Sequence, residues 1–210
     1  MRIFGTVALA AAVFSVAVAA AFAHGHSTAA HAAPMHHDMM GMTIVGPTAS
    51  GDLPAGQLAT ARAATARFAN DLGAAKKAGY RILTRLIPGM GYHFINPSIK
   101  GFDVRKPPIL VYERHGSRWQ LGALEWVFPA TPATPPLKGA SYGSFPAACH
   151  YDDGTFTPQP SASACAPNSP QSGSKLNFWH PALTTMHVWI WYPNPDGMYA
   201  SMNPLVHAFG

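Results

Sequence analysis

The 210-residue chain has little charge: Asp, Glu, Lys and Arg make up only 11% of it. Its fourteen basic and nine acidic residues give a formal net charge of +5, and no run of Lys or Arg concentrates it. Proteins that bind nucleic acid need clustered basic side chains to neutralise phosphates. We therefore expect no nucleic-acid partner.

Cysteine is also scarce. Cys149 and Cys165 are the only two, and neither lies in a Cys-x-x-Cys motif, which argues against a redox pair of that kind. In an oxidising compartment they are expected to form a disulfide that closes a loop of about 16 residues and contributes about 3 kcal/mol. A reactive or copper-binding thiolate is the alternative interpretation.

Long hydrophobic runs are limited to the start of the chain. Met1-Arg2 supplies a positive charge, the segment from Val7 to Ala21 is apolar, and Ala21-Phe22-Ala23 has the small-x-small pattern of a cleavage site. The run is short for a membrane-spanning helix. Residues 1–23 are therefore predicted to be a signal peptide, with a membrane anchor as the alternative. The mature protein would be periplasmic or secreted, without a membrane span.

Motifs of common enzymes are missing as well. The segment Gly139-Ala140-Ser141-Tyr142-Gly143 matches the Gly-x-Ser-x-Gly pattern of hydrolases, but prolines lie close on both sides of it. That motif requires a strand before it and a helix after it. No phosphate-binding glycine loop is present either. A non-enzymatic protein is favoured, and the enzyme class stays open.

Histidine and methionine are abundant in one stretch, residues 24–42, where they account for nine of nineteen positions. Imidazole and thioether groups are ligands that suit copper, the thioether favouring Cu(I). Apolar periodicity is absent, so residues 24–50 are predicted to be a flexible metal-binding arm. A low-complexity spacer is the alternative. The candidate ligands are His24, His26, His31, Met35, His36, His37, Met39, Met40 and Met42.

Cleavage after Ala23 would give the arm the terminus His24-Gly25-His26. A free amine, two backbone amides and the His26 imidazole form a square-planar site of four nitrogens, which selects Cu(II) or Ni(II). The amine and ring of His24 offer a competing chelate. Both arrangements depend on that one cleavage position.

Residues 51–210 are predicted to form a single domain that starts with a helix. Apolar and small side chains recur at steps of three and four, and Gly79 follows Lys76 and Lys77 as a stop signal. The face predicted to be buried consists of Leu58, Ala61, Thr65, Phe68, Leu72 and Ala75.

After Gly79 the pattern is typical of strands. Expected strands cover residues 80–86, 92–95, 109–113, 119–128 and 185–192, with a hairpin turn near His115-Gly116-Ser117. Residues 129–184, rich in Pro, Ser, Gly and Ala, are predicted to be a long irregular segment. The expected class is α+β: one N-terminal helix packed with a curled, mainly antiparallel sheet of four to five strands.

Five short segments form a recognisable pattern along the second part of the chain: Ala78-Gly79-Tyr80, Gly91-Tyr92-His93-Phe94, Val111-Tyr112-Glu113, Ala123-Leu124-Glu125-Trp126-Val127 and Met186-His187-Val188-Trp189-Ile190-Trp191-Tyr192-Pro193-Asn194-Pro195. This pattern resembles a family of exported bacterial proteins without an assigned activity. The resemblance spans about residues 58–206 and implies export and one shared domain, but it assigns no catalytic residue.

Three ionisable residues, His93, Glu125 and His187, lie within strands among apolar neighbours. Alternation places Glu125 on one face with Leu121, Ala123 and Val127. A buried carboxylate is costly unless it is paired or neutralised. A hydrogen-bonded pair, for example with His93, Arg81 or a tyrosine, is the preferred interpretation, and a metal site of two histidines and a carboxylate is the alternative.

The leading functional hypothesis is an exported, non-enzymatic protein that binds copper or a similar transition metal through its arm. A second hypothesis is a binding module for a small apolar or aromatic ligand, with Tyr92, Trp189 and Trp191 lining a pocket beneath the 129–184 segment. A metalloenzyme that uses His93, Glu125 and His187 is the third.

Overall fold

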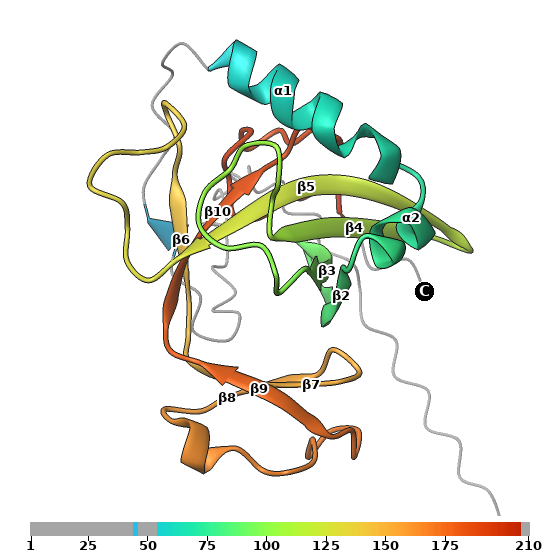
Figure 1. Ribbon diagram of the computed structural model, residues 1–210, viewed down its shortest axis with the longest axis vertical. Coiled ribbons are helices and arrows are strands. Elements are labelled where there is room, and N and C mark those ends of the chain that lie inside the picture. Colours follow the sequence, from blue (N-terminus) through green and yellow to red (C-terminus); the bar gives the residue numbers. More distant parts are fainter. Residues whose placement is uncertain (1–43, 46–53, 207–210) are drawn as a thin grey trace, which may run out of the picture. The chain divides into compact units, whose positions relative to one another are not determined.

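The computed structural model describes residues 44–45 and 54–206. Within these residues a seven-stranded antiparallel sheet has the order β1-β6-β10-β5-β4-β3-β2, and a three-stranded antiparallel sheet has the order β8-β7-β9 (Figure 1). The class is α+β with a curled antiparallel sheet, as predicted. The strands are β1 (Ile44–Val45), β2 (Arg81–Ile87), β3 (Gly91–Ile95), β4 (Ile109–His115), β5 (Arg118–Phe128), β6 (Tyr142–Phe145), β7 (Ala148–Tyr151), β8 (Phe156–Pro158), β9 (Leu176–His180) and β10 (Leu183–Val188).

The predicted single helix is interrupted. The chain forms α1 (Ala55–Thr65), a 3₁₀ turn η1 (Ala66–Phe68) and α2 (Leu72–Lys77). Asp71 caps α2, because its Oδ1 accepts a hydrogen bond from Ala74 N at 2.8 Å. All six side chains predicted to form the buried face are nevertheless buried.

The helices cover one face of the large sheet (Figure 1). Their buried face packs in one cluster with sheet residues that include Leu110, Leu124 and Trp126. Tyr112 anchors the helical segment, because its hydroxyl donates to Phe68 O at 2.8 Å, and Leu121 N donates to Ala69 O at 2.7 Å. The opposite face of the sheet is not covered by the helices and carries a separate cluster of buried side chains.

A bulge in β5 decides which residues share each face. Val111 pairs with Ala123, whereas Tyr112 pairs with Leu121, so Gly122 is an extra residue. Leu121 therefore joins the cluster under the helices, and the prediction that it shares a face with Glu125 is wrong. Ala123 and Val127 pack in the cluster on the opposite face.

The 129–184 segment is far more regular than expected, because it contains β6, β7, β8, β9 and the start of β10. It also contains the 3₁₀ turn η2 (Ala162–Ala164). The predicted count of four to five strands is too low for this reason. Cys149 in β7 and Cys165 after η2 form the predicted disulfide.

The small sheet is attached to β2 of the large one. Arg85 N donates to Gly154 O at 2.8 Å, and the Arg85 guanidinium forms an ion pair with Asp153. Gly154 has a φ of +81°, and a Cβ there would lie 2.6 Å from Ile82 Cγ1. The two sheets therefore meet at a point that accepts no side chain.

The last predicted strand ends four residues early, at Val188. Trp189 N donates to Met198 O at 2.8 Å, and the Trp191 and Tyr192 amides donate to Gly122 O. The chain thus leaves the sheet after Val188. Residues 191 and 192 are then fixed by their hydrogen bonds to Gly122, the extra residue of the bulge. Among the described helices, none is long and apolar enough to span a bilayer.

Candidate metal centre

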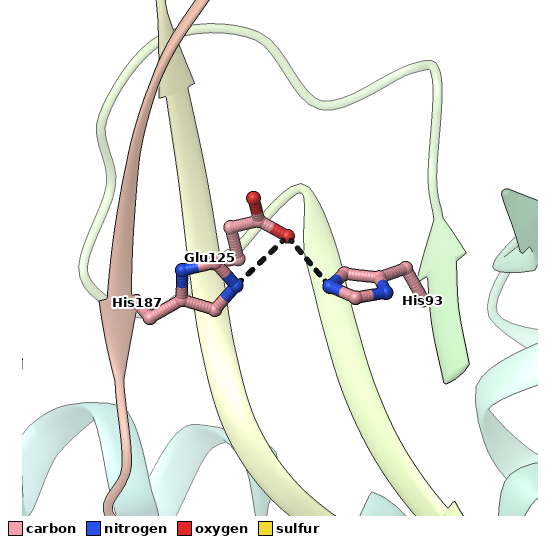
Figure 2. Close-up of side chains that lie close together, drawn as sticks. All are labelled: His93, Glu125 and His187. Atoms are coloured by element: carbon pink, nitrogen blue, oxygen red, sulfur yellow. Dashed lines mark ion pairs between the residues drawn. The ribbon is translucent and has the colours of Figure 1, made fainter. Parts of the chain in front are cut away.

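His93, Glu125 and His187 converge on the face of the large sheet that the helices do not cover. They come from β3, β5 and β10, and His187 lies directly opposite Glu125 in the register of β10 with β5 (Figure 2). One ligand atom from each residue lies within 4.8 Å of those of the other two. Sequence reasoning named the three residues, and the strand order brings them together.

Both histidines direct Nε2 at the same carboxylate oxygen (Figure 2). Glu125 Oε2 lies 3.6 Å from His93 Nε2 and 3.7 Å from His187 Nε2. Hydrogen bonds of this type are 2.7–3.2 Å long. The pairing of Glu125 with His93 is therefore present at ion-pair distance, but the groups are too far apart for a good hydrogen bond.

The three side chains are almost completely buried, with exposed fractions of 5% for His93, 6% for Glu125 and 1% for His187. Among the described residues, Glu125 Oε2 and both ring nitrogens of His187 have no hydrogen-bond partner. Buried polar atoms normally have partners, since leaving one unpaired costs about 1–3 kcal/mol. These unpaired atoms are therefore available to bind a group that is not part of the chain.

Burial also changes the protonation of the site. It raises the pKa of the Glu125 carboxyl to about 8 and lowers the pKa of His187 to about 4. Burial, with nearby His187 and His150, lowers the pKa of His93 to about 3. At neutral pH the metal-free cluster is therefore mainly a protonated acid and two neutral imidazoles, both of which have a lone pair for a metal.

The geometry suits a transition metal. Zinc binds imidazole nitrogen and carboxylate oxygen at about 2.0–2.2 Å, so two ligands in a tetrahedral site are about 3.4 Å apart. The distances of 3.6 and 3.7 Å from Glu125 Oε2 to the two histidines would shorten by a few tenths of an ångström on binding. The ligand nitrogens of His93 and His187, which lie within 4.8 Å of each other, would also have to approach to about this spacing. Three protein ligands leave at least one position of a tetrahedral ion open.

His93 is held in the orientation that a ligand requires. Its Nδ1 is hydrogen-bonded to Thr84 Oγ1 at 2.8 Å, and Thr84 is buried in β2. Metal-binding histidines usually donate their second N–H to an oxygen, which fixes the ring and its tautomer. His187 instead stacks on Trp189, with ring centroids 6.4 Å apart and an interplanar angle of 15°.

A cavity of about 80 Å³ adjoins the cluster, and His93 and Glu125 form part of its wall. Apolar side chains of the large sheet, including Ile109 and Val127, line it together with Phe145. The small sheet closes the opposite side with His150, Phe178 and His180. Because a water needs about 10–15 Å³ by this measure, the cavity has room for several waters or for a ligand of a few heavy atoms.

The aromatic residues proposed to line a pocket lie apart from this cavity. Tyr92 packs edge-to-face on Trp119, and Trp189 Nε1 donates to Ala200 O at 2.8 Å. Trp191 Nε1 donates to Thr65 Oγ1 at 3.0 Å, so its ring belongs to the helix side of the sheet. Strand alternation over residues 185–192 predicts that Trp189 and Trp191 point the same way as His187. This is wrong for Trp191, whereas Trp189 does share that face.

Sequence reasoning missed His150, His180, Phe178 and Thr84. The first three lie in residues 129–184, whose Pro, Ser, Gly and Ala content predicts an irregular segment. The only signal was the alternation of Phe178 with His180. The arm ligands of residues 24–42 lie outside the described residues, so the arm stays a prediction.

No family model matches this chain, and comparison with curated proteins and with solved structures finds no match either.

Proposed function

We propose that this is an exported protein whose folded domain binds a divalent late transition metal through His93, Glu125 and His187. The observation that carries the proposal is the convergence of three buried ligand atoms, two of them without a hydrogen-bond partner. Two imidazoles and one carboxylate form a set that suits zinc and neighbouring metals, copper included. The disulfide fits the oxidising compartment that a signal peptide implies, so a periplasmic or secreted location belongs to the same proposal.

An open coordination position next to a cavity favours a role beyond structural support. Structural zinc sites use four protein ligands, whereas sites that act on a ligand keep a position free. Here the cavity wall contains Glu125 and His93 beside apolar side chains. A metal held there would polarise or bind the donor atom of a small, mainly apolar molecule. This supports the binding-module and metalloenzyme hypotheses together, with the metal as their common element.

The test is the rise in Tm that Zn²⁺ causes in the mature protein. Metal that binds only the folded state stabilises by about 2.7 kcal/mol at 100 times Kd, which corresponds to roughly 5–10 °C for a domain of this size. An arm that binds equally well in the unfolded chain adds nothing to this shift. Glu125→Gln should therefore abolish most of the shift.

His115→Gln is the matched control, because it removes a histidine of the large sheet that does not belong to the cluster. It should keep the full shift. A wild-type shift of zero, or an undiminished shift in Glu125→Gln, would refute the site.

We also propose that the His/Met arm of residues 24–42 collects copper, which rests on its density of ligands. Titration with Cu(I) and Cu(II) should give a lower stoichiometry when residues 24–42 are deleted. Equal stoichiometry would refute a role for the arm and leave the internal site untouched.

A further inference from the structure

A second pair of histidines lies on the cavity wall that the small sheet supplies. His150 comes from β7 and His180 from β9, and their Nε2 atoms are 3.0 Å apart. The pair is surrounded by aromatic rings, among them Phe178, which stacks on His150 with centroids 5.0 Å apart. Because the two Nε2 atoms lie so close together, the positions of the ring protons determine whether this contact is favourable.

The contacts of the second nitrogen, Nδ1, show where the proton of each ring lies. His150 Nδ1 lies 3.1 Å from Leu83 O, and His180 Nδ1 lies 2.6 Å from Pro181 O. A carbonyl oxygen only accepts hydrogen bonds, so both Nδ1 atoms donate. In a neutral imidazole the remaining nitrogen is an acceptor with a lone pair. Both Nε2 atoms therefore present lone pairs to each other, which is unfavourable unless a cation lies between or beside them.

The cation is either a shared proton or a metal ion, and three observations favour the metal. Burial lowers the pKa of both rings, that of His150 to about 4. Donation of the second N–H to a backbone carbonyl is the usual arrangement of metal-binding histidines. Two nitrogens in adjacent positions on zinc or Cu(II) lie about 2.9–3.4 Å apart, given metal–nitrogen distances of about 2.0–2.1 Å.

We infer that His150 and His180 bind a second divalent late transition metal, facing the same cavity as the His93, Glu125 and His187 centre. The 3.0 Å separation argues against a linear Cu(I) ion, which would hold its two nitrogens about 4 Å apart. Only two protein ligands are available among the described residues, so solvent or a cavity ligand would complete the coordination. The site should be weaker and more exchangeable than its neighbour.

The test compares the Zn²⁺-induced shift of Tm in four versions of the mature protein: wild type, His180→Gln, Glu125→Gln and the double variant. Each single variant should lose part of the shift, and the double variant should show none, because neither site then remains. His115→Gln again serves as the control. A full wild-type shift in His180→Gln would overturn the second site.

The four versions separate the two proposals. Loss of the shift only in His180→Gln would refute the first centre and support the second, and loss only in Glu125→Gln would do the reverse. Imidazole ¹⁵N spectra of the wild type cover the case in which a variant folds poorly. Zn²⁺ should move the Nε2 resonances of His150 and His180. Unmoved resonances would show that the pair shares a proton only.

Discussion

At the scale of the residue, Glu125 determines the properties of the proposed metal centre. A carboxyl group on a strand whose two faces are both buried is expensive to ionise, and the protein keeps it protonated near neutral pH in the absence of metal. A bound cation removes that penalty because it replaces the proton. The Glu125 carboxyl therefore destabilises the metal-free fold at high pH and would serve as a ligand in the proposed metal-bound form.

This predicts a pH dependence for chelator-treated protein. The pKa of the carboxyl is about 4.5 in the unfolded chain and about 8 in the folded one. Between these values the folded state holds a proton that the unfolded state has released, so stability falls as pH rises from about 4.5 to about 8. Glu125→Gln has no such group. Urea unfolding of both proteins across this range should show the wild type losing stability relative to the variant, and a constant difference would contradict the assigned protonation.

Thr84 is a positioning residue for His93. Its hydroxyl is the partner of His93 Nδ1 at 2.8 Å. Thr84→Val keeps the shape but removes this oxygen, and it should weaken zinc binding about 10- to 100-fold, as loss of such a partner typically does. Thr84→Ser retains the hydroxyl and should retain most of the affinity. The zinc concentration at half-maximal Tm shift measures both, and equal weakening in the two variants would point to packing instead.

At the scale of the element, the small sheet closes the cavity, and Gly154 controls how it meets β2. A Cβ at this position would lie 2.6 Å from Ile82 Cγ1 and 3.0 Å from Arg85 N. Gly154→Ala should lower the free energy of unfolding by about 1–2 kcal/mol for its positive φ and by about 1–3 kcal/mol more for the clash.

Gly173→Ala is the control, since Gly173 has a similar φ of +73° with no atom within 4 Å of its Cβ position. Gly173→Ala should lose only the roughly 1–2 kcal/mol that the positive φ costs. Urea denaturation measures both variants. Equal losses of unfolding free energy in the two variants would mean that the contact between the sheets adjusts to the added methyl group without loss of stability.

The elements also show where sequence reasoning succeeds. The steps of three and four from Leu58 to Ala75 give the buried face correctly even though the α-helix is interrupted between Thr65 and Leu72. Burial requires one apolar face and does not require a continuous ladder of helical hydrogen bonds. The hairpin of β4 and β5 is confirmed, since its turn and its apolar arms are local signals.

Non-local features could not be predicted in the same way. The small sheet is built from short strands within Pro- and Ser-rich sequence, so no run is long enough to show a period of two. His150 and His180 meet only through the pairing of β7 with β9 and therefore have no signature along the chain. The bulge at Gly122 is invisible for the same reason, and it displaced Leu121 from its predicted face.

At the scale of the whole molecule, the disulfide cross-links the small sheet that forms one wall of the cavity. Cys149 precedes His150 directly, and its partner Cys165 lies 16 residues away. Replacing both cysteines by serine should cost about 3 kcal/mol, as expected for a closed loop of this length. Urea unfolding of the double variant should match that of the reduced wild type. No loss in either would show that the small sheet is stable without its cross-link.

The predicted signal peptide has an equally direct test. Intact mass of the protein recovered after export should correspond to a chain that starts at His24. A start at any other residue would remove the terminal His24-Gly25-His26 chelate from consideration. It would leave the cluster of His93, Glu125 and His187 unchanged, because that cluster lies entirely within residues 93–187.

The extra residue at Gly122 lets the length of β5 vary by one without loss of the cluster. Because Gly122 has no partner in β4, a strand without it would keep Leu121 opposite Tyr112 and Ala123 opposite Val111 and would alternate regularly. Glu125 would then stay on the face of Ala123, toward the cavity. A relative that keeps His93, Glu125 and His187 but lacks Gly122 would thus still bring the three side chains together. For this fold, a gap of one residue at the bulge is no evidence that the cluster has been lost.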